Sequence, residues 1–159
     1  MKKIASFTVN HDTLFPGVYV SRVDHIGAEA ITSFDLRFTR PNFEPALENA
    51  PIHTIEHLAA TFLRNHEIWS DKVIYFGPMG CRTGFYLLLA GELNPVDIIP
   101  LLKELCHFVL DYEEDIPGAT RRDCGNFQDM NLYTAKHHMN NYLVKVLTDI
   151  AKERMIYSK

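Results

Sequence analysis

A histidine pair with a glutamate between its members is the part of this sequence best suited to chemistry. His53, Glu56 and His57 fall in one short run whose apolar neighbours recur at three- and four-residue steps, the spacing of an amphipathic helix. Residues four apart on a helix share one face, so both imidazoles can point at a single metal ion. Glu56 lies close enough to act as an acid or base without being a ligand. A histidine pair on a helix flank can also be plain polar surface, so the motif alone leaves both interpretations open.

The three cysteines have different sequence surroundings. A catalytic metal site needs a third protein ligand and an open position, and Cys124, in a loop before the last predicted helix, is our candidate for that ligand. Cys106 falls among regularly spaced apolar residues, so we expect a small buried hydrophobe. Cys81 lies in a glycine-rich turn beside Arg82, and a nearby cation favours the thiolate needed for proton abstraction. For Cys81 two alternatives remain, an incidental turn thiol and a metal ligand in place of Cys124.

The elements that position these side chains follow from hydrophobic periodicity and turn residues. In chain order the pattern predicts two strands within 18–38 that meet near His25-Ile26-Gly27, a helix over 52–66, strands over 72–76 and 85–90, a helix over 95–110 and a helix over 132–155. Pro100 should bend the first turns of the second helix or mark its start. We therefore predict one α+β domain over 1–159, with an antiparallel sheet of about four strands and helices packed on one face.

Composition excludes several classes of function. The chain has 16 Lys and Arg against 20 Asp and Glu, a formal net charge of −4, so no broad cationic field would attract nucleic acid or an anionic membrane. No apolar run approaches the roughly 20 residues of a membrane span, and no secretion segment follows the first residues. An odd number of widely spaced cysteines fits a reducing compartment. We expect a cytoplasmic enzyme.

Several blocks, in this order and spacing, resemble one known family over essentially the whole chain. They are Ser6-Phe7 with His11, residues 34–38 with Pro41-Asn42, residues 53–58, residues 78–81 with 83–87, and Cys124-Gly125. Together they are similar to the S-ribosylhomocysteine lyases (LuxS), which make the precursor of autoinducer-2. Two positions depart from the family pattern: Ser33 stands where some members carry Lys, and residues 75–77, beginning with Tyr75, replace a more polar stretch.

This resemblance implies a small homodimer with two active sites at the subunit interface. It implies one divalent metal per subunit, Fe(II) in the cell and replaceable by Zn or Co. The implied reaction cleaves the thioether of S-ribosylhomocysteine to homocysteine and 4,5-dihydroxypentane-2,3-dione by carbonyl migration and β-elimination. The residues that match the family's positions are His53, His57 and Cys124 as metal ligands, Cys81 and Glu56 as acid/base groups, and Ser6, His11 and Arg37 as substrate contacts.

Two rival functions use the same residues differently. The pattern His-x-x-Glu-His is also that of inverted zinc peptidases, in which the glutamate activates a metal-bound water. Those enzymes usually take a carboxylate as third ligand, belong to much longer chains, and would leave Cys81 without a role. A structural zinc module is the second rival, and it would need a fourth protein ligand because structural zinc sites are closed.

Overall fold

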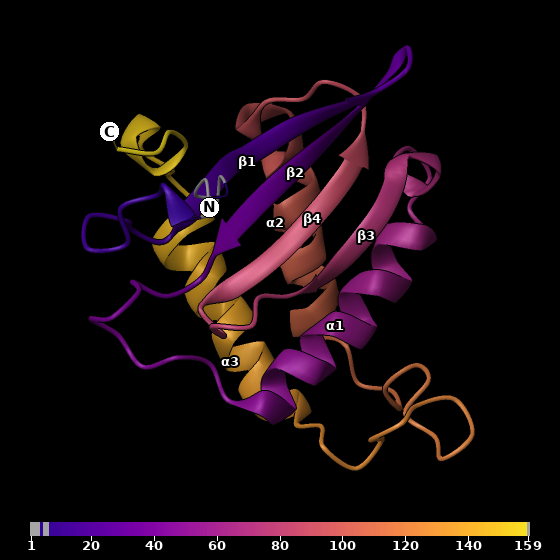
Figure 1. Ribbon diagram of the computed structural model, residues 1–159. Helices are drawn as coiled ribbons and strands as arrows, with labels where there is room; N and C mark the ends of the chain where they lie inside the picture. Colours follow the sequence, from indigo (N-terminus) through magenta and orange to yellow (C-terminus); the bar gives the residue numbers. More distant parts are fainter. Residues whose placement is uncertain (1–3, 5–6, 159) are drawn as a thin grey trace.

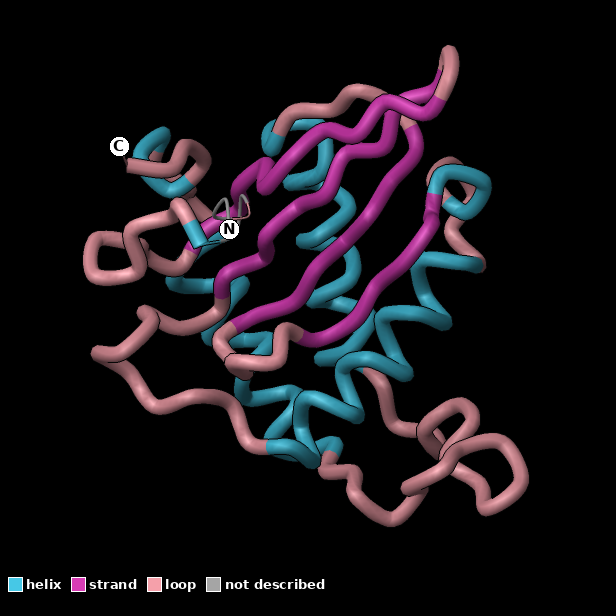
Figure 2. Tube along the Cα trace, viewed as in Figure 1, coloured by secondary structure: helices cyan, strands magenta, loops and turns pink. Residues whose placement is uncertain are grey.

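The computed structural model describes residues 4 and 7–158, and its centre is a four-stranded antiparallel sheet in the order β1-β2-β4-β3 (Figures 1 and 2). The strands are β1 (Gly17–Ile26), β2 (Glu29–Arg37), β3 (Val73–Pro78) and β4 (Gly84–Ala90). The predicted α+β class and strand number are confirmed.

The first two strands form the hairpin that the sequence predicts. Ile26 pairs with Glu29 across a turn in which Gly27 has a φ of +64°, a conformation that costs glycine little. Further along, Gly17 pairs with Arg37. This register brings the end of β2 beside the start of β1, and the same end of β2 pairs with Gly84 of β4.

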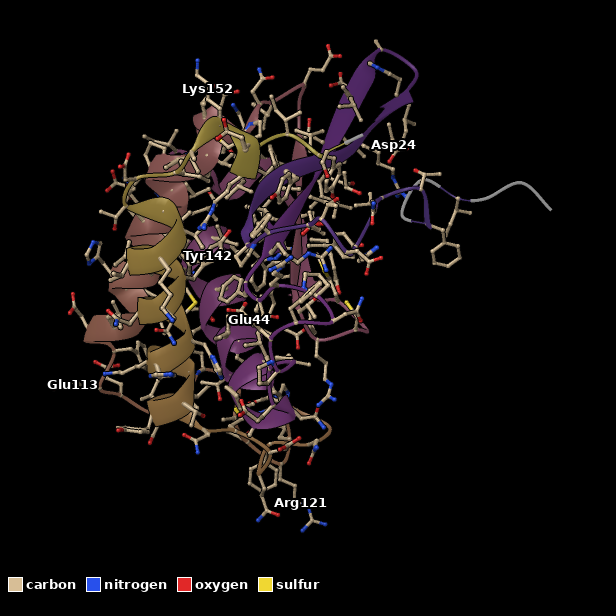
Figure 3. All side chains as sticks on the ribbon, turned by 90° about the vertical axis from the view of Figure 1, so that its left-hand side faces the viewer. Asp24, Glu44, Glu113, Arg121, Tyr142 and Lys152 are labelled. Atoms are coloured by element: carbon tan, nitrogen blue, oxygen red, sulfur yellow. The ribbon has the colours of Figure 1, made fainter. Side chains whose placement is uncertain are left out.

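Three helices cover one face of the sheet, as the side view in Figure 3 shows, and their buried faces form the core with the strands. Helix α1 (Asn49–Arg64) carries both histidines of the motif and begins three residues earlier than predicted. Its buried stripe of Ile52, Ile55, Leu58, Ala59 and Leu63 follows the predicted spacing. The opposite edge of the helix is therefore left to present polar side chains.

Helix α2 (Pro95–Asp111) begins where the sequence predicts. The backbone N–H of Asn94 donates to the Asp97 carboxylate at 2.7 Å, one half of a capping box. Pro95 takes the first helical position and Pro100 lies inside the helix, so Pro100 does not mark its start. Cys106 is 1% exposed on this helix, which confirms its predicted place in the core.

The prediction of one helix over 132–155 is wrong at its C-terminal end. Helix α3 (Leu132–Tyr142) passes into a π-helical turn, Leu143–Leu147, because both the backbone N–H and the hydroxyl of Thr148 donate to the Leu143 carbonyl, at 2.9 and 2.8 Å. The chain then reverses, and a short 3-10 turn, Lys152–Arg154, lies against β1. Hydrophobic periodicity carries no information about a hydrogen bond from one threonine hydroxyl.

None of the helices among the described residues has both the length and the apolar character needed to cross a membrane.

Candidate metal centre and substrate pocket

Helix α1 and the loop before α3 bring His53, His57 and Cys124 together. One potential ligand atom from each lies within 4.8 Å of the others, although Cys124 is 71 residues from His53 in the chain. The Cys124 Sγ is 3.4 Å from His53 Nε2, and the two imidazole rings are 4.8 Å apart at 79°. All three side chains are half-buried. The helical spacing therefore aims both rings at the sulfur.

Backbone carbonyls fix which nitrogen of each ring faces this point. His53 Nδ1 lies 3.1 Å from the Asp129 carbonyl and His57 Nδ1 lies 2.7 Å from the Pro117 carbonyl. A carbonyl oxygen only accepts, so each Nδ1 carries the hydrogen and each Nε2 keeps its lone pair. Such outer hydrogen bonds accompany nearly all metal-ligating histidines. Two Nε2 atoms and one thiol sulfur fit a borderline transition metal with a position left for water or substrate.

Two loop residues support this arrangement. Gly118 has a φ of +71°, and a β-carbon there would come within 3.3 Å of His57 Nδ1, so glycine allows the Pro117 carbonyl to face the ring. The backbone N–H of Asn126 donates to the Cys124 sulfur at 3.4 Å and helps to hold that side chain toward His53.

Glu56 lies beside the potential ligands in an open cavity of about 410 Å³, here called the Glu56 pocket. The side chain is half-buried, and His57, Phe76 and Gly118 are among its neighbours in the lining. The carboxylate is thus placed to exchange protons with a molecule that enters next to the histidines.

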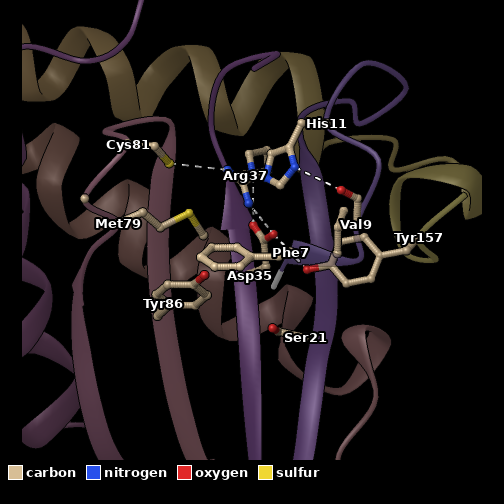
Figure 4. Close-up of a pocket in the computed structure, with 11 residues that line it drawn as sticks. Phe7, Val9, His11, Ser21, Asp35, Arg37, Met79, Cys81, Tyr86 and Tyr157 are labelled. Atoms are coloured by element: carbon tan, nitrogen blue, oxygen red, sulfur yellow. Dashed lines mark hydrogen bonds and ion pairs between the residues drawn. The ribbon is translucent and has the colours of Figure 1, made fainter. Parts of the chain in front are cut away.

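Cys81, His11 and Arg37 meet in a second cavity of about 260 Å³, the Cys81 pocket, shown in Figure 4. Phe7, Tyr86 and Tyr157 add aromatic side chains to its lining. The Nδ1 of His11 donates to the Val9 carbonyl at 3.0 Å, so Nε2 is the ring nitrogen left for other contacts. Ser6 lies outside the described residues.

Arg37 is held by a buried ion pair that the sequence analysis missed. Its Nη2 and Nε donate to the two carboxylate oxygens of Asp35, at 2.5 and 3.1 Å, and both side chains are at most 4% exposed. The Tyr157 hydroxyl donates to the same carboxylate at 2.8 Å, and the Tyr157 ring stacks on Tyr19 with centroids 4.8 Å apart. The sequence offered one signal for Asp35: it carries a charge opposite to that of Arg37 and lies two residues away in the same predicted strand. Tyr157 offered none, because its contact depends on the course of the C-terminal segment.

The surroundings of Cys81 favour its charged form. Burial raises the pKa of the thiol, but hydrogen bonds from the Thr83 side chain and backbone, and from Arg37, outweigh that effect, so the pKa lies below its ordinary value. The Arg37 Nη1 is 3.8 Å from the sulfur and the Thr83 hydroxyl is 3.1 Å away. The lowered pKa increases the share of thiolate, the form of Cys81 that can remove a proton from carbon.

The sequence-predicted residues thus form two groups. His53, His57, Cys124 and Glu56 lie together, and Cys81, Arg37 and His11 lie together, while the Cys81 and Glu56 pockets share no lining residue. Of the departures from the family pattern, Ser33, buried in β2, and Tyr75, exposed on β3, line neither pocket, whereas Phe76 of the 75–77 stretch lines the Glu56 pocket.

Comparison with known proteins gives a consistent result. The family model described as S-Ribosylhomocysteinase (LuxS) matches residues 4–153. Curated relatives named S-ribosylhomocysteine lyase include those of Clostridium beijerinckii at 57% identity, Finegoldia magna at 55% and Borrelia garinii at 49%, each aligned over 99% of this chain and 99% of the relative. A peptidase with the same five-residue motif is not favoured by these matches. Both the family match and the near-complete alignments show that the chain belongs to the S-ribosylhomocysteinase (LuxS) family.

Proposed function

We propose that this protein is a carbon–sulfur lyase that converts S-ribosylhomocysteine to homocysteine and 4,5-dihydroxypentane-2,3-dione. The observation that carries the proposal is the convergence of two imidazoles and a thiol from distant segments, in a chain of this family. The two products contain all the atoms of the substrate. The ribose opens to an aldehyde, the carbonyl migrates by enolisation, and the sulfur leaves by β-elimination, so no oxidant or reductant is required.

In this proposal His53, His57 and Cys124 hold one divalent ion, which we take to be Fe(II), with Zn or Co able to substitute. A divalent ion bound there supplies Lewis-acid stabilisation of the negative charge that enolisation places on substrate oxygens. The thiolate of Cys124 offsets part of the ion's charge. The carbonyls that hold both Nδ1 atoms orient the imidazoles before substrate arrives.

Cys81 and Glu56 are the proposed proton carriers. The Cys81 thiolate, stabilised by Thr83 and Arg37, takes a proton from one substrate carbon and returns it to the next during each isomerisation. Glu56, half-buried next to His57, moves protons at the substrate oxygens and assists the final elimination. Two groups on different sides of the substrate meet the need for separate carbon and oxygen proton transfers.

Substrate binding is assigned to Ser6, His11 and Arg37. His11 and Arg37 line the Cys81 pocket, where they can hold hydroxyl groups or the amino-acid end by hydrogen bonds. Because Asp35 holds the Nε and Nη2 edge of the Arg37 guanidinium, Nη1, which faces Thr83 and Cys81, is the nitrogen turned toward a ligand beside the sulfur.

A homodimer completes the proposed site. The acid/base groups Cys81 and Glu56 line cavities that share no residue within one chain. A second copy that places its Cys81 pocket over the Glu56 pocket would put both groups around one substrate. Symmetric dimers form two such sites, because the same surface of each chain contributes once to either site.

Thiol release tests the function directly. Protein purified without oxygen and loaded with Fe(II) is incubated with S-ribosylhomocysteine, and free homocysteine is titrated with a disulfide reagent that releases a coloured thiolate. We expect one thiol per substrate consumed, and near-complete loss of turnover for Cys81→Ala at unchanged metal content. Absence of thiol release from metal-loaded protein would remove the proposed function. Peptide hydrolysis that survives Cys81→Ala would favour a peptidase instead.

A further inference from the structure

Thr83 lies between two functional side chains of the Cys81 pocket. It is 7% exposed at the end of the loop that joins β3 to β4. Its hydroxyl oxygen is 2.6 Å from Arg37 Nη1 and 3.1 Å from Cys81 Sγ. A single hydroxyl therefore links the guanidinium to the sulfur, whereas the direct distance from Arg37 Nη1 to the sulfur is longer, 3.8 Å.

The direction of these hydrogen bonds follows from the chemistry of the groups. A guanidinium has donors and no acceptor, so Arg37 donates to the Thr83 oxygen. The hydroxyl hydrogen of Thr83 remains, and the sulfur of Cys81 is the partner within reach. A thiolate accepts this hydrogen strongly and a neutral thiol accepts it weakly, so the chain of donors that begins at Arg37 ends on a negatively charged sulfur.

We propose that Thr83 is a positioning residue that holds Cys81 as a thiolate, by accepting a hydrogen bond from Arg37 and donating its own hydroxyl hydrogen to the sulfur. Thr83 is assigned no contact with the substrate and acts through Cys81. The inference depends on the proposed function only in assigning the Cys81 thiolate to proton transfer.

The loop fixes this geometry before any substrate binds. The Met79 N–H donates to the Gly84 carbonyl at 3.0 Å, and the Arg82 N–H donates to the Met79 carbonyl at 2.9 Å. Arg82, between Cys81 and Thr83, has a φ of +57°, a left-handed conformation that curls the two side chains to the same side. Two N–H groups of the adjoining segment, those of Phe38 and Thr39, donate to the Thr83 carbonyl. The hydroxyl is thus held in place and not recruited by the ligand.

The test measures the ionisation of Cys81 without turnover. Metal-loaded wild type, Thr83→Val and Thr83→Ser are alkylated with iodoacetamide across pH, and modification is quantified on the Cys81 peptide, so Cys106 and Cys124 do not contribute. We expect Thr83→Val, which keeps the shape of the side chain and removes the hydroxyl, to shift the midpoint of the alkylation rate against pH to higher pH. A rise of one unit in the pKa of Cys81 would slow alkylation about tenfold at neutral pH. Thr83→Ser should stay within about twofold of wild type.

Coincident profiles for wild type and Thr83→Val would overturn the inference, and so would a Thr83→Ser variant that behaves like Thr83→Val. Variants are compared only where circular dichroism and melting match wild type, and Thr83→Ala replaces Thr83→Val if the latter does not fold. The other titratable groups around the sulfur are unchanged throughout: Arg37, Asp35, Tyr86, His11 and Tyr157.

Turnover gives a second, separate readout. The pH profile of kcat should move to higher pH in Thr83→Val while KM changes little, since the substrate contacts assigned to His11 and Arg37 remain. If no variant, wild type included, releases thiol but the alkylation profile still shifts, the proposed function is wrong and the inference about Thr83 stands.

Discussion

Three thiols of one chain acquire three different chemistries from their neighbours. Burial in α2 raises the pKa of Cys106 to about 12, which keeps it neutral. Donors from Thr83 and Arg37 overcome burial at Cys81 and lower its pKa. Cys124 faces the free Nε2 of His53 and accepts a backbone N–H. Side-chain type therefore decides little here, and the surrounding donors decide what each sulfur can do.

Cys106 should resist alkylation in the folded protein. The residue is 1% exposed and burial raises its pKa to about 12, so at pH 6 to 9 it offers almost no thiolate and almost no access to the reagent. Timed iodoacetamide labelling followed by peptide mass spectrometry should show Cys81 modified and Cys106 intact until denaturant is added. Labelling of both at similar rates in native protein would contradict the assigned burial.

Glu56→Gln should keep the metal and lose most turnover. The amide preserves the size of the side chain but cannot accept a proton, and removal of a general acid/base group typically costs about 10²- to 10⁴-fold in rate. Thiol release and metal content, the latter by plasma mass spectrometry, are measured on the same sample. Cys81→Ala, which removes the other proposed proton carrier, serves as the comparison variant. Loss of the metal from Glu56→Gln would mean that the carboxylate is a ligand.

Single residues were predictable where their role depends on local sequence. Cys106 was placed in the core by its spacing, and the His53 and His57 rings converge as helical geometry requires. Asp35 was missed as the partner of Arg37 although it lies two residues away on the same strand, whereas Tyr157 was missed because its hydrogen bond to Asp35 joins the middle of the sheet to the end of the chain. No local pattern carries such long-range information.

At the scale of elements, the metal centre is built from one regular and one irregular part. Helix α1 gives both imidazoles a common direction, and the loop between α2 and α3 supplies a thiol together with the carbonyls of Pro117 and Asp129. Hydrophobic spacing predicted the helix well, because one buried stripe determines it. The loop could be predicted only as a loop, since its path follows backbone hydrogen bonds. The same limitation explains the wrong end of the third predicted helix, where Thr148 bonds to the Leu143 carbonyl.

Gly118→Ala should weaken metal binding more than it weakens the fold. Alanine at a φ of +71° costs about 1 to 2 kcal/mol, and its β-carbon would lie 3.3 Å from His57 Nδ1, so the Pro117 carbonyl must move from the ring. Loss of such an outer hydrogen bond typically lowers metal affinity about 10- to 100-fold. Competition with a chromophoric chelator measures the affinity.

Gly125→Ala is the matched control, because a β-carbon at that position meets no heavy atom within 4 Å and the residue immediately follows the proposed ligand Cys124. We expect its metal affinity to stay within about twofold of wild type, since no outer hydrogen bond is displaced. Equal loss of affinity in both glycine variants would show that general loop disturbance, and not the contact with His57, controls the site.

For the molecule as a whole, the core and the metal centre are structurally separate. The core is made of the inner face of the sheet and the buried stripes of the three helices, and none of His53, His57 and Cys124 belongs to it. A chain of 159 residues buries enough surface to fold without a metal. We expect a chelator to abolish thiol release while a cooperative thermal transition remains. Simultaneous loss of activity and of folded structure would indicate a structural metal instead.

Mixing two inactive variants tests whether the working site spans two chains. Cys81→Ala and Glu56→Gln change residues that line separate pockets of one chain. In a mixed dimer with shared sites, one site carries both changes and the other carries neither. Random subunit exchange makes half of the dimers mixed, so activity should recover to about a quarter of wild type. Native mass spectrometry verifies that mixed dimers form. Mixed dimers that stay inactive would place both proton carriers of each site in the same chain.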